Sequence, residues 1–108
     1  MRILFDQGTP VAIQRSLQGH IVKTANQQGW SALSNGELLR VAGESGFDVL
    51  LTTDRNLPYQ QNLQSRKIAI VVLGRNRWSL IQPMLQEIVA AVNAAKPGSY
   101  TLVEIPGE

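Results

Sequence analysis

The chain has 108 residues, of which 44% are hydrophobic, so it is long enough for one domain with a substantial core. Ten Lys and Arg residues against eight Asp and Glu residues give a formal net charge of +2, too small to drive nucleic-acid binding by itself. The absence of cysteine excludes disulfides and thiolate metal sites and agrees with the cytoplasmic location that we expect. Since neither a signal peptide nor a long apolar run is visible, we expect no membrane association.

Short apolar runs alternate with helical patterns, which is typical of βαβ units and a mostly parallel sheet. The strands that we expect cover residues 3–5, 20–24, 48–53, 68–73 and 100–105. The expected helices cover residues 10–18, 35–45, 57–64 and 80–95, with Thr9 and Ser79 as N-caps of the first and the last. Right-handed crossovers then predict one α/β domain over residues 1–108, a three-layer α/β/α sandwich with a five-stranded sheet of order 2-1-3-4-5.

Two aspartates directly follow buried strands of this predicted sheet. Asp6 follows the first strand and Asp54 follows the third. In this strand order the two strands are neighbours, about 4.8 Å apart, and their carboxyl ends lie at the edge where ligands bind in such sheets. Two carboxylates so close repel each other and require a cation, for which Mg²⁺ or Mn²⁺ with oxygen ligands is the natural choice. We therefore expect a metal site at this edge.

Glu37 is a third acidic candidate with two readings. Ser34 and Glu37 have the spacing of a capping box, in which the glutamate reaches back to the N-cap amide. The start of this helix also faces the same edge of the sheet, so that Glu37 would point towards Asp6. The spacing does not choose between the two roles.

Polar residues beside Asp54 are candidates for a supporting role. Thr53 or Asn56 would orient Asp54 or hydrogen-bond a water molecule in the site. Asn56 also fits the cap of the helix expected from Leu57, which is the more common role for such a residue.

A basic loop leaves the fourth strand at the same edge. Arg75, Arg77 and Trp78, joined by Arg55, suit a phosphate backbone and a stacked base. The alternative is that Trp78 packs under the following helix and the arginines are only solvated. His20, the only histidine, is expected at the opposite edge of the sheet. Without a second histidine, a cysteine or a nucleophile-elbow serine, catalytic-triad and zinc-hydrolase readings have no support. Without a glycine-rich phosphate loop, the dinucleotide-binding reading is weak.

Three segments resemble the short PIN-like domains, which are related to the ribonuclease toxins of bacterial toxin–antitoxin pairs. They are Ile3–Pro10, Ser34–Leu39 and Val49–Leu57, and the Thr-Thr-Asp-Arg-Asn block is the most specific part. The resemblance covers about residues 1–73. It implies that Asp6, Glu37 and Asp54 hold one or two Mg²⁺ or Mn²⁺ ions that activate water for phosphodiester hydrolysis.

On this resemblance we expect a metal-dependent nuclease acting on RNA, with the toxin of a toxin–antitoxin pair as one identity and a small antitoxin as its partner. A homodimer through the last helix or the fifth strand is another partnership to consider. Gln7 and Asn35 stand where relatives often carry acids, so the alternative is a non-catalytic PIN-like module that binds RNA or a protein. A phospho-accepting receiver domain shares the strand order, but the acid pair and the lysine that it needs are lacking.

Overall fold

A computed structural model describes residues 1–57 and 67–107 of the chain. Its five-stranded sheet has the order β2-β1-β3-β4-β5, and every neighbouring pair is parallel. The strands are β1 (Arg2–Phe5), β2 (Ile21–Thr24), β3 (Val49–Thr52), β4 (Ala69–Leu73) and β5 (Tyr100–Val103). The predicted α/β class and strand order are confirmed, and the sheet is parallel throughout.

The burial of each strand follows from its place in the sheet. All residues of β3 and β4 are buried, as expected for central strands whose two faces are both covered. Along the edge strand β2, exposed and partly buried residues alternate. The pairing of β1 with β3 sets Phe5 opposite Leu51, so both strands end at the same level.

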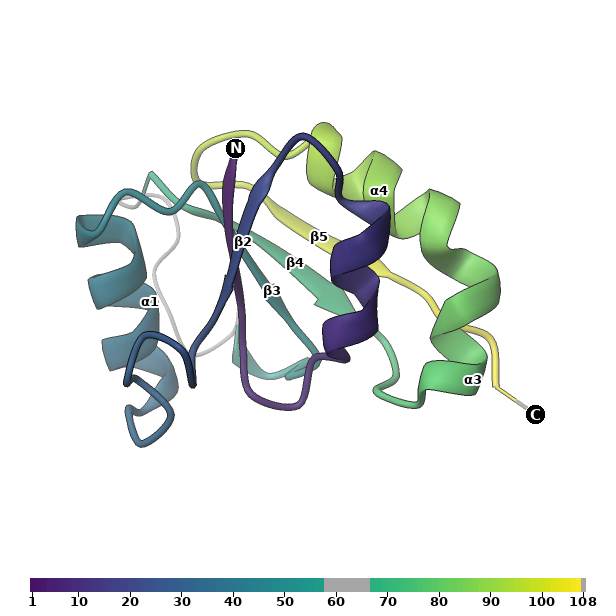
Figure 1. Cartoon of the computed structure of the whole chain (residues 1–108), viewed down its shortest axis with the longest axis horizontal. Coiled ribbons are helices and arrows are strands. Elements are labelled where there is room, and N and C mark those ends of the chain that lie inside the picture. The colour runs from purple at the N-terminus through teal and green to yellow at the C-terminus, as the bar shows by residue number, and fades with distance from the viewer. Residues whose placement is uncertain (58–66, 108) are drawn as a thin grey trace.

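Helices lie on both faces of the sheet (Figure 1), and each face has its own hydrophobic core. One face is covered by α1 (Asn35–Glu44), where Leu39 packs with Leu4 and Leu50. The other face is covered by η1 (Val11–Ser16), α3 (Trp78–Ile81), η2 (Gln82–Met84) and α4 (Leu85–Asn93). Successive strand residues therefore enter different cores, which explains why the central strands read as unbroken apolar runs.

The first helical segment differs from the prediction in its type and in its cap. It is a 3₁₀ helix that follows Pro10, and its N-cap is Pro10 rather than Thr9. Thr9 is buried, and its hydroxyl donates a hydrogen bond of 3.0 Å to the carbonyl oxygen of Leu51. Prediction of Thr9 as the cap was therefore wrong, because β3 offers this hydroxyl a buried acceptor.

The last helical segment starts and ends two residues earlier than predicted and is less regular. It starts at Trp78 with Arg77 as its N-cap, so the prediction of Ser79 as the cap was wrong. Pro83 has no N–H to donate to the carbonyl of Ser79, and the helix passes through η2 before α4 begins. The helix predicted over residues 57–64 lies almost entirely outside the described residues. Among the described helices, none is long and apolar enough to cross a bilayer.

Candidate functional site

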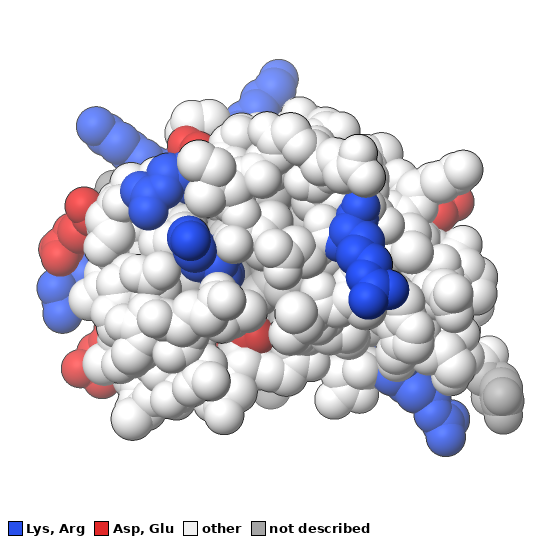
Figure 2. Space-filling model, in the orientation of Figure 1, with Lys and Arg blue, Asp and Glu red and all other residues white. Residues whose placement is uncertain are grey.

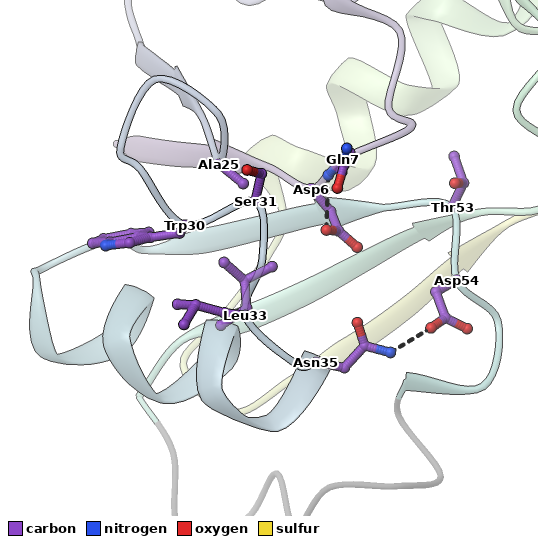
Figure 3. Close-up of a pocket in the computed structure, with 10 residues that line it drawn as sticks. Asp6, Gln7, Ala25, Trp30, Ser31, Leu33, Asn35, Thr53 and Asp54 are labelled. Atoms are coloured by element: carbon purple, nitrogen blue, oxygen red, sulfur yellow. Dashed lines mark hydrogen bonds between the residues drawn. The ribbon is translucent and has the colours of Figure 1, made fainter.

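A cleft of about 280 Å³ opens beyond the carboxyl ends of β1 and β3, beside the start of α1 (Figure 3). This is the edge at which ligands bind in open parallel sheets. Both predicted aspartates line it, together with Gln7, Ala25, Trp30, Ser31, Leu33, Asn35, Leu38 and Thr53. The structure therefore brings Asp6 and Asp54 to one cleft, as the strand order predicted.

Asp6 continues β1 by one residue and is held in one orientation. Its backbone N–H donates to the carbonyl oxygen of Leu51 at 2.9 Å, which extends the pairing with β3. Its Oδ1 accepts a hydrogen bond of 2.8 Å from the backbone N–H of Gln7, and its Oδ2 accepts one of 2.7 Å from the hydroxyl of Thr52. With two donors on its oxygens, the partly buried carboxylate is fixed towards the cleft.

Asp54 is held by the loop that follows β3 and by α1. Its Oδ1 accepts from the backbone N–H of Asn56 at 2.9 Å, and its Oδ2 accepts from Asn35 Nδ2 at 2.6 Å (Figure 3). The predicted support from Asn56 thus comes from its backbone. Asn35, the first residue of α1, ties the helix to the loop through this contact.

Thr52 joins the two aspartates, and the sequence reasoning missed it. Its fully buried hydroxyl donates to Asp6 Oδ2 at 2.7 Å and accepts from the backbone N–H of Asp54 at 3.1 Å. Thr53, predicted to support Asp54, lines the cleft instead, and its side chain makes no hydrogen bond within the described part of the chain. The strand register could have identified Thr52, because continuing the Phe5–Leu51 pairing by one residue sets Asp6 opposite Thr52.

Glu37 lies at the start of α1 in a complete capping box. Its Oε1 accepts from the backbone N–H of Ser34 at 3.2 Å and from the Ser34 hydroxyl at 2.9 Å, and Ser34 Oγ accepts from the Glu37 N–H at 3.3 Å. Hydrogen bonds from the hydroxyl and then from the backbone of Ser34 hold the pKa of Glu37 below its usual 4.5. The side chain is exposed and is not among those that line the cleft.

The acidic cleft therefore holds two carboxylates rather than three. Among the described residues, no group of three His, Cys, Asp or Glu side chains is close enough together to hold a metal ion. The polar side chain that α1 contributes is Asn35, whose carbonyl oxygen is turned towards Asp6 in Figure 3. This is an all-oxygen set of two carboxylates and one amide.

That set fits a hard divalent cation of the Mg²⁺ type. Mg²⁺ keeps several water molecules and needs only one or two protein carboxylates besides substrate phosphates. A carboxylate has about four lone-pair sites, and the hydrogen bonds described above use two on Asp6 and two on Asp54. Both side chains therefore keep capacity for a ligand, whereas a closed cage made of protein alone is not supported.

A second cleft, of about 410 Å³, lies beside the first and is basic. It is lined by Thr53, Gly74, Arg75, Asn76, Arg77 and Leu80, and Thr53 also lines the acidic cleft. Figure 2 shows Lys and Arg side chains scattered over the viewed face rather than gathered in one patch. The positive charge that could attract phosphates is therefore that of the arginines in this cleft and not of a broad basic surface on the viewed face.

The predicted basic residues differ in their freedom. Arg55 bonds Glu104 Oε2 at 3.3 Å through Nη2 and the Gly74 carbonyl at 3.4 Å through Nε. Arg75 donates from Nε to the carbonyl of Ile105 at 3.0 Å, while Arg77 is exposed. The C-terminal segment thus holds two of the three arginines, and Arg77 has the most freedom to meet a phosphate.

Trp78 and His20 make contacts within the fold and not with a ligand site. Trp78 is partly buried and packs against the core beneath α4, in agreement with the alternative reading of this residue. His20 Nε2 is 2.9 Å from Asn93 Oδ1, and its Nδ1 is 3.1 Å from the N-terminal amine. His20 lines neither cleft.

No protein-family model, no curated protein and no solved structure matches this chain. The PIN-like resemblance stays a prediction, and the arguments for a function rest on the geometry of the two clefts.

The pH dependence of stability tests the role of Glu37 as a cap. Because its pKa is lowered in the fold, ionised Glu37 stabilises the protein above its usual 4.5, and this contribution is lost as the pH falls through the lowered value. We expect the difference in melting temperature between wild type and Glu37→Gln to shrink as the pH is lowered from about 6 to about 3. A constant difference over that range would contradict the cap.

The same variant separates the cap from a metal ligand. We expect Glu37→Gln to keep its affinity for Mn²⁺, because the glutamate points to Ser34. A loss of Mn²⁺ affinity as large as that of a cleft aspartate variant would mean that Glu37 leaves Ser34 and joins the site. Ser34→Ala is the matched control, with an expected cost of about 1 kcal/mol in unfolding free energy.

Proposed function

We propose that this protein is a metal-dependent nuclease of PIN-like type that hydrolyses phosphodiester bonds in RNA. The observation that carries the proposal is the pair of Asp6 and Asp54, oriented at one sheet edge and joined by the buried hydroxyl of Thr52. A basic cleft beside the pair adds a place for flanking phosphates. This combination suits an anionic substrate whose reacting group must approach two carboxylates through a cation.

The residues of the chain divide the work as follows. Asp6, Asp54 and the carbonyl oxygen of Asn35 would hold Mg²⁺ or Mn²⁺, which when bound supplies Lewis acidity to a phosphate and neutralises the repulsion between phosphate and carboxylates. Thr52 holds the Asp6 carboxylate next to the backbone of Asp54, so little reorganisation is needed there when the substrate binds. Arg77, with Arg75 and Arg55, would guide the neighbouring phosphates.

A non-catalytic PIN-like module that binds RNA or a protein is the second candidate. It is favoured by the neutral residues Gln7 and Asn35 in the cleft and by the position of Glu37 at the cap, which leave only two carboxylates. Such a module would bind a divalent cation weakly and would not cleave RNA. We keep the cytoplasm as the proposed location, with a small antitoxin or a second copy of the chain as proposed partners.

Incubating the purified protein with single-stranded RNA, with Mn²⁺ or with EDTA, tests the proposal. We expect cleavage only with Mn²⁺, together with a rise in melting temperature that corresponds to about 2.7 kcal/mol at a metal concentration one hundred times Kd. Asp6→Asn should lose both effects, since it removes one carboxylate. Glu44→Gln, which removes an exposed acid paired with Arg40, is the control and should keep both. Metal-independent cleavage, or stabilisation without cleavage, would refute the nuclease.

A further inference from the structure

The acidic cleft has two chemically different ends. Figure 3 shows Asp54 at one end, Trp30 at the other and Leu33 between them. Ala25 and Leu38 are further apolar residues that line the cleft. Two-carboxylate chemistry needs no such wall, so the apolar end requires a separate explanation.

Trp30 is held as a rigid wall of this cleft. Its ring meets the ring of Phe47 edge-on, with centroids 6.1 Å apart and an interplanar angle of 77°. Its backbone N–H donates to the carbonyl of Ala25 at 2.8 Å, and its carbonyl accepts from the N–H of Leu33 at 3.1 Å. The side chain packs against the core on the α1 side of the sheet but is only partly buried, and it lines the cleft.

Polar groups elsewhere along the cleft are available for a ligand. Ser31 and Gln7 are exposed residues that line the same cleft. Neither side chain takes part in a hydrogen bond within residues 1–57 and 67–107. A cleft with an aromatic wall, a free hydroxyl and, beside Asp6, a free amide is suited to a flat heterocycle whose edges form hydrogen bonds.

We propose that the Trp30 end of the cleft is a subsite for one unpaired nucleobase, adjacent to the phosphate that meets Asp6 and Asp54. This subsite rests on the proposed function for the identity of its substrate. The whole cleft, at about 280 Å³, is slightly smaller than the pockets of about 300–1,000 Å³ that take drug-sized ligands, which agrees with a single base rather than a larger ligand. The base must be unpaired, because a base stacked in a duplex exposes neither of its faces to Trp30.

The basic cleft extends this arrangement into a path for a strand. Thr53 lines both clefts, so a chain with its base at Trp30 and a phosphate at Asp6 and Asp54 continues past Thr53 towards Arg77. Base, reacting phosphate and flanking phosphate then meet an aromatic, an acidic and a basic surface in that order. The single aromatic wall gives stacking without a code for one base, so we expect tolerance of base identity.

Fluorescence of Trp30 tests the subsite without relying on activity. Trp30 and Trp78 are the two tryptophans, so Trp78→Phe leaves Trp30 as the only one. This substitution is combined with Asp54→Asn to prevent turnover, and the protein is titrated with single-stranded U6 in the absence of divalent metal. We expect saturable quenching of Trp30, and weaker binding with a U6 in which one internal base is missing. Equal quenching and affinity for the two oligonucleotides would overturn the subsite.

Two substitutions of Trp30 separate stacking from packing. Trp30→Leu keeps an apolar side chain but has no aromatic face, whereas Trp30→Tyr keeps the face. Measured by anisotropy of labelled oligonucleotides, Trp30→Leu should weaken binding of intact U6 by about 5- to 150-fold and leave binding of the abasic form unchanged. Trp30→Tyr should stay near wild type. An equal loss for both oligonucleotides would assign Trp30 to packing only and refute the proposal.

The result is distinguishable from a failure of the nuclease proposal. If wild-type protein with Mn²⁺ cleaves no RNA but base-dependent quenching persists, the subsite stands and the protein is an RNA-binding module. If RNA is cleaved but the missing base changes neither affinity nor fluorescence, the nuclease stands and the subsite is refuted.

Discussion

Asp54→Asn is expected to reduce Mn²⁺-dependent RNA cleavage by at least about a hundredfold, because loss of a metal ligand should cost more than the 10–100-fold typical of its hydrogen-bonding partners. Asp54 is the aspartate that both α1 and the loop after β3 hold in place, through Asn35 and the backbone of Asn56. An amide at this position would keep the shape of the side chain and remove its charge. The metal affinity, measured by titration calorimetry, should fall together with the cleavage rate.

The fold should survive this substitution. An amide oxygen still accepts from the N–H of Asn56, and Asn35 can turn its own amide so that its oxygen faces the introduced NH₂ group. We therefore expect a melting temperature close to that of wild type in the absence of metal. Glu44→Gln serves as the charge-matched control on the surface of α1. Unchanged cleavage by folded Asp54→Asn would remove this residue from the site and with it the nuclease proposal.

Thr52→Val should damage stability and activity together. Valine has the same shape but lacks the hydroxyl, so Asp6 Oδ2 loses a donor and the partly buried N–H of Asp54 loses an acceptor. Leaving such groups unpaired costs about 1–3 kcal/mol, and each kcal/mol lowers the melting temperature of a domain of this size by about 4–8 °C. Cleavage, measured well below the melting temperature, should fall by about 10–100-fold because Thr52 orients the Asp6 carboxylate and holds the backbone of Asp54.

Neighbouring substitutions make this prediction specific. Thr53→Val changes the next residue, which lines the cleft without a side-chain hydrogen bond in the described part of the chain, so both stability and Mn²⁺ affinity should stay near wild type. Thr52→Ser keeps the hydroxyl and should restore most of the cleavage. If Thr52→Val lost stability but cleaved RNA at the wild-type rate, Thr52 would have a structural role only.

The contrast between Thr52 and Thr53 shows why the site was only partly predictable. In sequence both threonines precede Asp54, and Thr53 was predicted as its support because it is directly adjacent to the acid. Only the register between β1 and β3 distinguishes them, since it sets Thr52 opposite Asp6 on the same face of the sheet. Because successive side chains of a strand point to opposite faces of the sheet, Thr53 points away from the face on which Thr52 meets Asp6.

Glu37 and Asn35 show the same limit at the start of α1. The spacing of Ser34 and Glu37 predicted a capping box, which is present. The reading of Glu37 as a metal ligand came from the family resemblance and remains a prediction that its cap position makes less favourable. Asn35 reaches Asp54 from a position that local patterns treat only as a helix start. Which of the two side chains faces the cleft depends on how α1 docks, and no local pattern encodes that.

What the sequence by itself determined is the parallel α/β sheet, its strand order and the meeting of Asp6 and Asp54 at one edge. Apolar runs are visible in the local sequence and the handedness of crossovers is nearly universal, so both can be used for prediction without a structure. Only the tertiary structure decided that Thr52 joins the aspartates, that Asn35 rather than Glu37 lines their cleft, and that Trp30 forms its far wall. These depend on register and on helix docking, which are set by packing between segments distant in the chain.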